Sequence, residues 1–153
     1  MSSPVLDNLP SALSEHVGYL LVRLGKHAQR LFSLKVDALS VRPAHCDILL
    51  TLVAHGTLAQ VEIANILSIE RAHLVSLLDQ LESLGLVLRE PDAVDRRRHA
   101  VQLTAKGMQV ATKISRLAAE VEDELLEPLP KRDRRILRNM LRVLAKDADE
   151  GDL

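Results

Sequence analysis

The residues with the clearest capacity for chemistry form a short basic run, Asp95-Arg96-Arg97-Arg98. Between Arg89 and Lys106 the chain carries five cations and three anions, a net charge of +2, whereas the whole chain has a net charge of −1. Arginine binds phosphate oxygens through two parallel hydrogen bonds and enters narrow DNA minor grooves favourably. We expect Asp95 to orient one of these guanidiniums by an ion pair. Because a charged run in a turn is commonly only solvated, its function depends on the elements that hold it.

A second group of polar side chains could bind a small anion. His16, Tyr19 and Arg23 lie at positions i, i+3 and i+7, on one face of an expected helix, and His45 lies at the start of the next helix. Together they offer hydrogen-bond donors and a cation for a carboxylate or a phosphate. The same residues could equally belong to a dimer interface or to the solvated surface, and the sequence leaves these interpretations open.

Spacing and composition argue against several other kinds of chemistry. The histidines show no HxxxH pattern, Cys46 is the sole cysteine and the six glycines are scattered, so we expect no metal site and no cofactor. No nucleophile and base occur at a recognisable spacing, which argues against an enzyme. A lone cysteine forms no internal disulfide, and we find neither a secretory signal nor an apolar run of roughly 20 residues. We therefore expect a cytoplasmic protein with no membrane association.

Hydrophobic periodicity predicts six helices and one β-hairpin. Tyr19 and Phe32 are the only aromatic residues among 153, so Leu, Val, Ile and Ala supply most of the core, a composition that favours helices over sheets. We expect Ser68 to cap the fourth helix and Thr104 the fifth. The expected elements are a helix from Ser11 or Ser14, then Pro43–Gly56, Ala59–Leu67 and a fourth helix that follows the Ser68 cap and is terminated by Gly85. After it come strands Leu86–Glu90 and His99–Leu103, a helix between Thr104 and Pro128, and a last helix Arg132–Asp147 before a frayed tail.

The order of these elements predicts the fold class and its division into parts. Two short helices separated by residues 68–70 are typical of a helix-turn-helix, and the hairpin that follows would form its wing. The fold is therefore expected to be mostly α with a small β-hairpin wing. The long helices at both chain ends carry more apolar surface than one small lobe can cover, which predicts a homodimer. We divide the chain into an arm and first dimerisation helix (1–40), a winged helix-turn-helix DNA-binding lobe (41–104) and C-terminal dimerisation helices (105–153).

The segment Leu81–Gly107, LESLGLVLREPDAVDRRRHAVQLTAKG, resembles the MarR family of bacterial transcriptional regulators when it is taken with the preceding helix-turn-helix. The resemblance covers nearly the whole chain. It implies a homodimer in which the terminal helices pack together and each subunit projects one winged lobe. It also implies double-stranded DNA as the partner, with a pseudo-palindromic operator whose half-sites lie about one helical turn apart.

The resemblance also assigns the residues that contact DNA. It makes Glu70–Leu84 the recognition helix, and Arg97 matches the arginine of the family's wing. The chain departs from the family pattern because Arg71 and His73 are the main polar readers on this helix, and because Ala59 stands where a threonine often caps the third helix. We therefore expect the wing to carry more of the affinity. The expected DNA-contacting residues are Arg71, Ala72, His73, Val75, Ser76, Asp95, Arg96, Arg97 and Arg98.

Many members of the family respond to a ligand, which implies a repressor released by a small-molecule effector. The implied cavity lies where the first, second and fifth helices meet the lobe, with His16, Tyr19, Arg23 and His45 as candidate contacts. An aromatic acid or its coenzyme A thioester is the expected effector. Two alternatives remain open: a redox-sensing regulator that uses Cys46, since some relatives sense oxidation, and a winged-helix module that binds protein.

Overall fold

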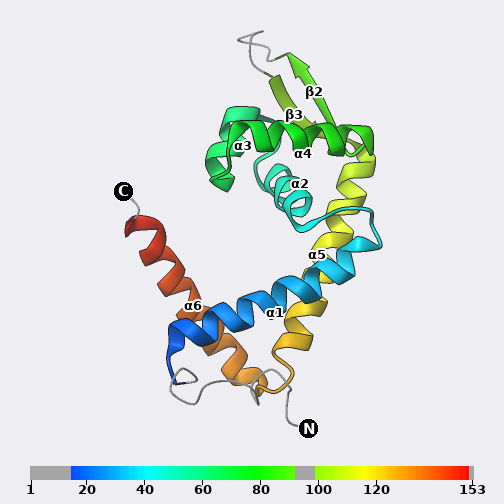
Figure 1. Ribbon diagram of the computed structural model, residues 1–153. Helices are drawn as coiled ribbons and strands as arrows, with labels where there is room; N and C mark the ends of the chain where they lie inside the picture. The colour runs from blue at the N-terminus through cyan, green and yellow to red at the C-terminus, as the bar shows by residue number, and fades with distance from the viewer. Residues whose placement is uncertain (1–14, 92–98, 152–153) are drawn as a thin grey trace.

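The computed structural model describes residues 15–91 and 99–151 of the chain (Figure 1). It is mostly helical with one small antiparallel sheet, which confirms the predicted fold class. The elements are α1 (Val17–Asp37), α2 (Pro43–His55), β1 (Leu58–Ala59), α3 (Gln60–Leu67), α4 (Arg71–Ser83), β2 (Val87–Pro91), β3 (His99–Leu103), α5 (Ala105–Leu125) and α6 (Lys131–Gly151).

Two helix ends differ from the prediction. Helix α1 begins at Val17 rather than near Ser11 or Ser14, because His16 has an extended backbone with φ −88° and ψ 117°. Helix α6 continues to Gly151, four residues past the expected end at Asp147. No proline or glycine interrupts the helix before that residue.

The turn between α3 and α4 also differs from the prediction. Ser68 does not cap α4; it ends α3 in the left-handed conformation with φ 51°, and its N–H bonds back to the carbonyls of Ala64 and Asn65. Glu70 occupies the N-cap position of α4 without a side-chain capping bond. A short polar residue suits either end of a helix, so the sequence alone did not distinguish the two roles.

The sheet has one more strand than the hairpin that was predicted. Strands β2 and β3 pair antiparallel in a register that joins Val87 to Leu103 and Pro91 to His99. The two-residue strand β1 pairs with the other edge of β3, so the strand order is β1-β3-β2. Two residues are too few to show an alternating pattern, and only the tertiary pairing defines this strand.

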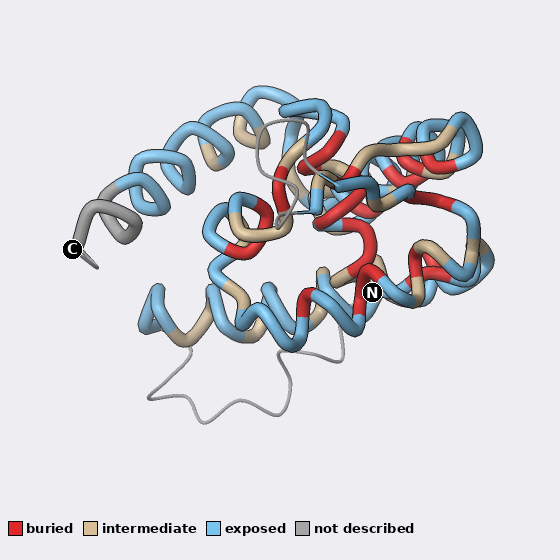
Figure 2. Tube along the Cα trace, turned by 90° about the horizontal axis from the view of Figure 1, so that it is seen from above, coloured by how far each residue is buried: buried red, intermediate tan, exposed pale blue. Residues whose placement is uncertain are grey.

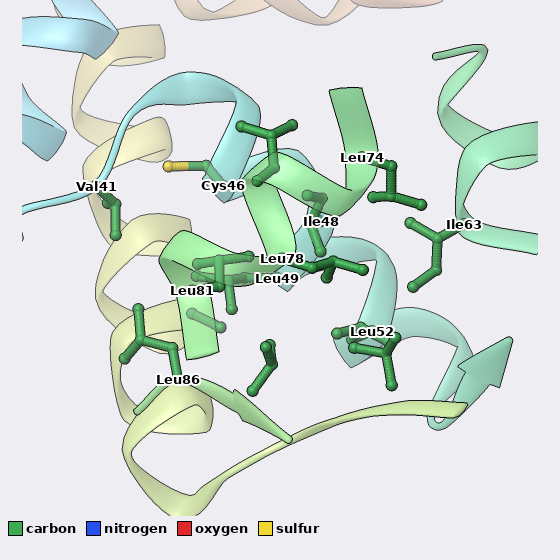
Figure 3. Close-up of a cluster of buried hydrophobic side chains, with 14 of the residues drawn as sticks. Val41, Cys46, Ile48, Leu49, Leu52, Ile63, Leu74, Leu78, Leu81 and Leu86 are labelled. Carbon is green, nitrogen blue, oxygen red and sulfur yellow. The ribbon is translucent and has the colours of Figure 1, made fainter. Parts of the chain in front are cut away.

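Aliphatic side chains from α2, α3, α4 and the sheet form the core of the lobe (Figure 3). Ile48, Leu49, Ile63, Leu78 and Leu81 have no solvent-accessible surface. Leucine side chains at positions i, i+3, i+4 and i+7 of α4 all enter this core, which fixes the rotation of that helix about its axis. The core therefore decides which side of α4 remains exposed.

The long helices lie outside this lobe. Helix α5 packs against α1 and α2, and its Ile114 is fully buried. Helix α6 turns away from the rest of the subunit (Figure 1), and every described side chain of α6 is exposed or only partly buried (Figure 2). Much of the apolar side of α6 is thus left uncovered by its own subunit.

Candidate nucleic-acid interface

Helix α4 has one buried side and one exposed side. Its buried side is made of Leu74, Leu77, Leu78 and Leu81. The five side chains that the sequence assigned to groove contact are all exposed: Arg71, Ala72, His73, Val75 and Ser76. The structure therefore leaves each of them accessible to a partner, while the leucines hold the helix in place.

The support for α4 begins at α3, whose start carries the unusual Ala59. Its methyl group accepts no hydrogen bond, so the side chain gives α3 no cap. Instead the Glu62 carboxylate accepts a hydrogen bond from the Ala59 N–H at 2.7 Å. A carboxylate near a helix N-terminus also interacts favourably with the helix dipole. Glu62 thus supplies the half of a capping box that bonds the N-cap N–H, whereas a threonine at position 59 would bond an N–H of the first helical turn.

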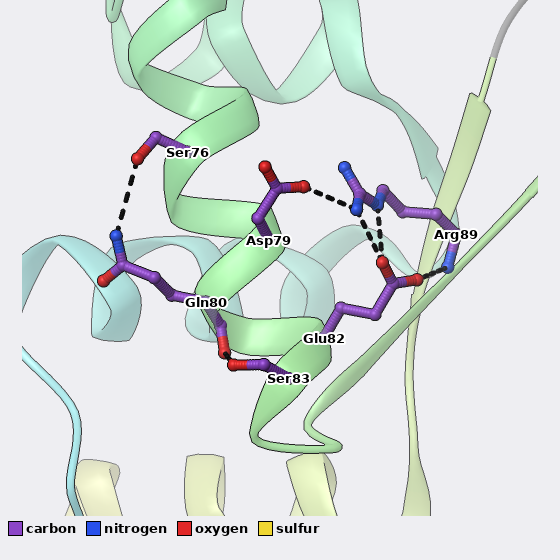
Figure 4. Close-up of polar contacts among 6 residues, drawn as sticks. All are labelled: Ser76, Asp79, Gln80, Glu82, Ser83 and Arg89. Atoms are coloured by element: carbon purple, nitrogen blue, oxygen red, sulfur yellow. Dashed lines mark hydrogen bonds and ion pairs between the residues drawn. The ribbon is translucent and has the colours of Figure 1, made fainter.

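An arginine on the wing strand is held by two carboxylates of α4 (Figure 4). Arg89 Nη2 lies 2.6 Å from Asp79 Oδ1 and 2.5 Å from Glu82 Oε2. The Arg89 N–H also donates to Glu82 Oε1 at 3.3 Å, so both the backbone and the side chain of β2 are engaged. The hydrogen bond from Arg89 lowers the pKa of Glu82, and the same bond raises the pKa of Arg89. These contacts fasten the base of the wing to α4.

The segment after β3 fastens the other strand of the wing. Thr104 Oγ1 accepts a hydrogen bond from Gly107 N–H at 2.9 Å, which confirms the predicted cap of α5, and donates to the Gly85 carbonyl at 2.7 Å. Lys106 Nζ donates to the Leu84 carbonyl at 2.8 Å, at the C-terminal end of α4 where a cation is favoured. The residues that carried the family resemblance therefore join the end of α4 to the start of α5.

These contacts change the interpretation of the basic hairpin. Arg89 and Lys106 contributed to its net charge of +2, but the structure engages both of them within the subunit. The other basic residues of this stretch are Arg96, Arg97 and Arg98. Together with Asp95 they lie outside the described residues. In the described part of the wing, Arg89 of β2 is braced against α4, and Thr104 and Lys106, which follow β3, contact the residues at the end of α4.

A hollow of about 450 Å³ lies beside the start of α4. It brings Arg71 and Val75 of α4 together with Gln60 of α3 and His99 of β3. Neither Gln60 nor His99 is among the site residues expected from the sequence. His99 directly follows the arginine run in the sequence, which is the one signal that could have indicated it, whereas Gln60 joins this surface only through the packing of α3 on α4.

Comparison with known proteins places this architecture in a family. The MarR family model matches residues 42–99, from the residue before α2 to the first residue of β3. The solved structure of the transcriptional repressor CouR, bound to a 23-mer DNA duplex, superposes with a TM-score of 0.80 at 37% sequence identity, over 88% of this chain and 96% of CouR. The chain belongs to the MarR family.

Two curated relatives agree with this family assignment. The HTH-type transcriptional repressor NicR of Pseudomonas putida is 26% identical over 150 residues, which cover 98% of this chain and 94% of NicR. The HTH-type transcriptional regulator FarR of Neisseria gonorrhoeae is 34% identical over 98 residues, 64% of this chain and 67% of FarR. As a MarR-family member, the protein is a transcriptional regulator and not an enzyme.

The candidate effector residues of this MarR-family chain do not gather at one point. His16 is exposed at the start of α1, and Tyr19 is half-buried. Arg23 lines a hollow of about 250 Å³ with three other basic side chains of α1, namely Lys26, His27 and Arg30. His45 is not part of that lining. Arg23 is therefore grouped with neighbours on α1 that are not among the expected effector residues.

His45 is instead buried between α2 and α4, with 3% of its surface exposed. Its Nδ1 accepts a hydrogen bond from the Arg42 backbone N–H at 3.2 Å, and its Nε2 lies 3.2 Å from Gln80 Oε1. Burial lowers the pKa of His45, an effect that the bond to Gln80 opposes and the charge of Arg42 reinforces. Both ring nitrogens are thus engaged inside the MarR-family lobe.

Cys46 also lies in the interior of the MarR-family lobe, with no exposed surface. Burial raises the pKa of its thiol to about 12, with a further contribution from the charge of Asp47. Since the thiolate is the form that reacts with oxidants, almost no reactive species exists at neutral pH. This environment opposes the redox-sensing alternative.

Residues 15–91 and 99–151 contain no group of three or more His, Cys, Asp or Glu side chains placed to hold a metal ion. Over the same ranges, none of the helices has the length and apolar character that crossing a bilayer requires.

Proposed function

We propose that this MarR-family protein is a homodimeric repressor that binds a pseudo-palindromic DNA operator and is released by a small anionic effector. The observation that carries the proposal is the exposed side of α4 beside a wing whose base is braced against that same helix. A duplex can contact both elements at once, with α4 in the major groove. CouR, a transcriptional repressor bound to DNA in its solved structure, and the repressor NicR support this role.

The proposed division of labour follows from chemistry. Arg71, His73 and Ser76 supply hydrogen-bonding groups on α4, whereas Ala72 and Val75 offer apolar contact to thymine methyl groups. Arg96, Arg97 and Arg98 supply cations for the phosphate backbone and the minor groove, with Asp95 as an orienting carboxylate. Because α4 carries few polar readers, the wing contributes a large share of the affinity.

The test begins with an operator selected from a random pool of duplexes by the wild-type protein. Binding is then measured by fluorescence anisotropy at several salt concentrations. Arg97→Ala is expected to weaken binding and to reduce the slope of log K against log salt by about 1, the loss of one cationic contact. Arg116→Ala, which removes an exposed cation of α5 far from the wing in sequence, is the control and should leave the slope unchanged.

The outcomes separate the competing functions. Equal slopes for Arg97→Ala and the wild type would contradict a contact between Arg97 and DNA. If the wild type retains no sequence-selective duplex at all, the winged-helix lobe is a protein-binding module and its wing charges serve solubility.

The dimer follows from apolar surface that one subunit leaves exposed. Val143 of α6 is 70% exposed and Val17 of α1 is 65% exposed. Exposed apolar residues recur along both helices: Val17, Leu21, Val22, Leu24 and Leu34 on α1, and Ile136, Met140, Leu141, Val143 and Leu144 on α6. A second copy of the chain would cover such long apolar stripes, which suits a regulator that reads two half-sites. We assign α1, α5 and α6 to this dimerisation region.

The effector proposal rests on the charge of α1. Arg23, Lys26, His27 and Arg30 share one hollow, and α1 contains no acidic residue before Asp37 at its end. Such a surface suits the carboxylate of an aromatic acid or the phosphates of its coenzyme A thioester. His16 and Tyr19 precede this cluster on the same helix, whereas His45 is buried in the lobe with both ring nitrogens engaged and does not join the cluster.

The effector is tested by titrating aromatic acids and their coenzyme A thioesters into the operator complex. An effector must bind the DNA-incompetent state more tightly, since equal affinity for both states shifts no population. We expect Arg23→Ala and Arg30→Ala to raise the concentration needed for release without altering affinity for DNA. Arg116→Ala again serves as the control. Release curves identical to wild type for both α1 variants would remove this helix from the effector site.

A further inference from the structure

A chain of hydrogen bonds links the interior of the lobe to the exposed side of α4. The Arg42 backbone N–H donates to His45 Nδ1 at 3.2 Å, and His45 Nε2 lies 3.2 Å from Gln80 Oε1. Gln80 Nε2 then donates to Ser76 Oγ at 3.5 Å, the contact drawn at the left of Figure 4. The chain begins at the N-terminus of α2 and ends at a residue assigned above to DNA contact.

The direction of every bond in this chain is fixed by its first member. A backbone N–H can only donate, so Nδ1 of His45 is the acceptor and the proton of the neutral ring lies on Nε2. That N–H requires an acceptor, which only the oxygen of the Gln80 amide provides. The amide nitrogen is therefore directed at Ser76, whose oxygen must accept.

The consequence lies in the hydroxyl proton of Ser76. Since Ser76 Oγ accepts from Gln80, its own O–H does not point along that contact and is left to donate elsewhere. Ser76 is exposed, whereas His45 is buried, so the state of an interior ring determines what an exposed hydroxyl can offer. The freed O–H can donate to guanine N7 or O6, to thymine O4 or to a phosphate oxygen, while the second lone pair of Oγ remains an acceptor.

We propose that His45 and Gln80 are positioning residues that hold the Ser76 hydroxyl as a hydrogen-bond donor toward an acceptor atom of the operator. This inference rests on the proposed function, because it requires α4 to face DNA. His45 of α2, which has no DNA contact of its own, would then help to determine the specificity for the operator.

The decisive experiment is a double-mutant cycle with Ser76→Ala and Gln80→Glu, measured at pH 7.5 on the operator selected by the wild type. Gln80→Glu keeps the side-chain shape and still accepts from His45, but the new carboxylate has no proton to donate and accepts from Ser76 as well. In the wild-type background, Ser76→Ala should weaken binding about fivefold, the loss of one ordinary hydrogen bond. In the Gln80→Glu background, the same change should alter binding less than about twofold.

The cycle cancels the repulsion between the new carboxylate and DNA, because that charge is present on both sides of the second comparison. Ser83 provides a matched control, since its hydroxyl already donates to the Gln80 backbone carbonyl at 2.7 Å. Ser83→Ala and Gln80→Glu should therefore combine additively. Circular dichroism melting confirms that each variant is folded before binding is compared.

The wild-type protein allows a second measurement without any substitution. Long-range proton–nitrogen NMR correlation of the His45 ring should show the proton on Nε2, and a proton on Nδ1 would overturn the proposal. Operator selection with the Ser76→Ala variant identifies the acceptor atom. A relaxed base preference at one operator position indicates a base edge, whereas equally weaker binding to all sequences indicates a phosphate.

The failure of this inference differs from the failure of the proposed function. If the wild type binds DNA selectively but the Ser76–Gln80 cycle is additive, only the positioning role of His45 and Gln80 is overturned. The same holds if Ser76→Ala has no effect on binding. Absence of selective binding by the wild type overturns the proposed function and this inference with it.

Discussion

Individual residues of the lobe perform tasks that their types alone do not reveal. Gly107 is an example, because a Cβ placed there would lie 2.0 Å from the Leu86 carbonyl oxygen. The glycine of the segment Leu103–Gly107 is therefore required by close packing of α5 on the wing base, and not by a special backbone angle. The same close approach accompanies the Thr104 and Lys106 contacts to the end of α4.

Gly107→Ala is expected to destabilise the protein by about 1–3 kcal/mol, because the methyl group must displace backbone atoms. Thermal unfolding should show a lower Tm, by about 2–4 °C per kcal/mol. Gly25→Ala is the control: nothing lies within 4 Å of its Cβ position in α1, so the change should stabilise the helix slightly. An unchanged Tm for Gly107→Ala would contradict the close packing.

Protonation of His45 should couple the stability of the lobe to pH. Its pKa in the folded protein is lowered from the ordinary value of 6.5, so the unfolded chain binds this proton more readily. The stability that neutral His45 contributes is therefore complete above pH 6.5 and decreases as pH falls below it. Urea unfolding between pH 7.5 and 5.5 should show a smaller pH dependence for His45→Gln than for the wild type; equal slopes would exclude this coupling.

At the scale of elements, the position of the wing depends on contacts with α4. Arg89 of β2 contacts both Asp79 and Glu82, which are three residues apart on α4. Contact with two separate carboxylates resists rotation of the strand on the helix. The pairing of β1 with β3 anchors the other side of the sheet. These contacts hold the base of the wing against α4.

Arg89→Gln should release this junction and weaken operator binding several-fold, since the wing and α4 would no longer be held in one geometry. The loss of stability should be about 1 kcal/mol or less, because the ion pairs are partly exposed. Anisotropy and melting measure the two effects. The control Arg134→Gln breaks a comparable contact, to Asp123, between α6 and α5. Operator affinity equal to wild type in Arg89→Gln would show that the brace is dispensable for DNA binding.

On the scale of the whole molecule, the exposed apolar side of α6 has no explanation within a single subunit. Contacts near its start, Arg134 to Asp123 and Arg138 to Glu122, join it to α5. Leu137 and Leu141 line a hollow of about 420 Å³ with residues of α1 and α5. Its other apolar side chains remain exposed, as expected of a helix that another copy covers.

Met140→Glu is expected to convert the proposed dimer to a monomer, because a carboxylate buried without a partner is strongly unfavourable at an apolar interface. Sedimentation velocity should show the lower mass, and binding to a two-half-site operator should weaken by more than tenfold. Ala145→Glu, at another exposed position of α6, is the charge-matched control. A dimeric Met140→Glu variant would place the interface elsewhere.

The sequence by itself determined the helices, the hairpin and the family, because these depend on local periodicity, on turns and on a motif read in order. The leucine spacing of α4 also determined which of its side chains are exposed, from Arg71 to Ser76. The tertiary structure decided what depends on distant partners: the strand β1, the engagement of Arg89 by α4, and the burial of His45 beside Gln80. A residue type shows which bonds it can form, but only the packing of separate elements decides which partner it meets.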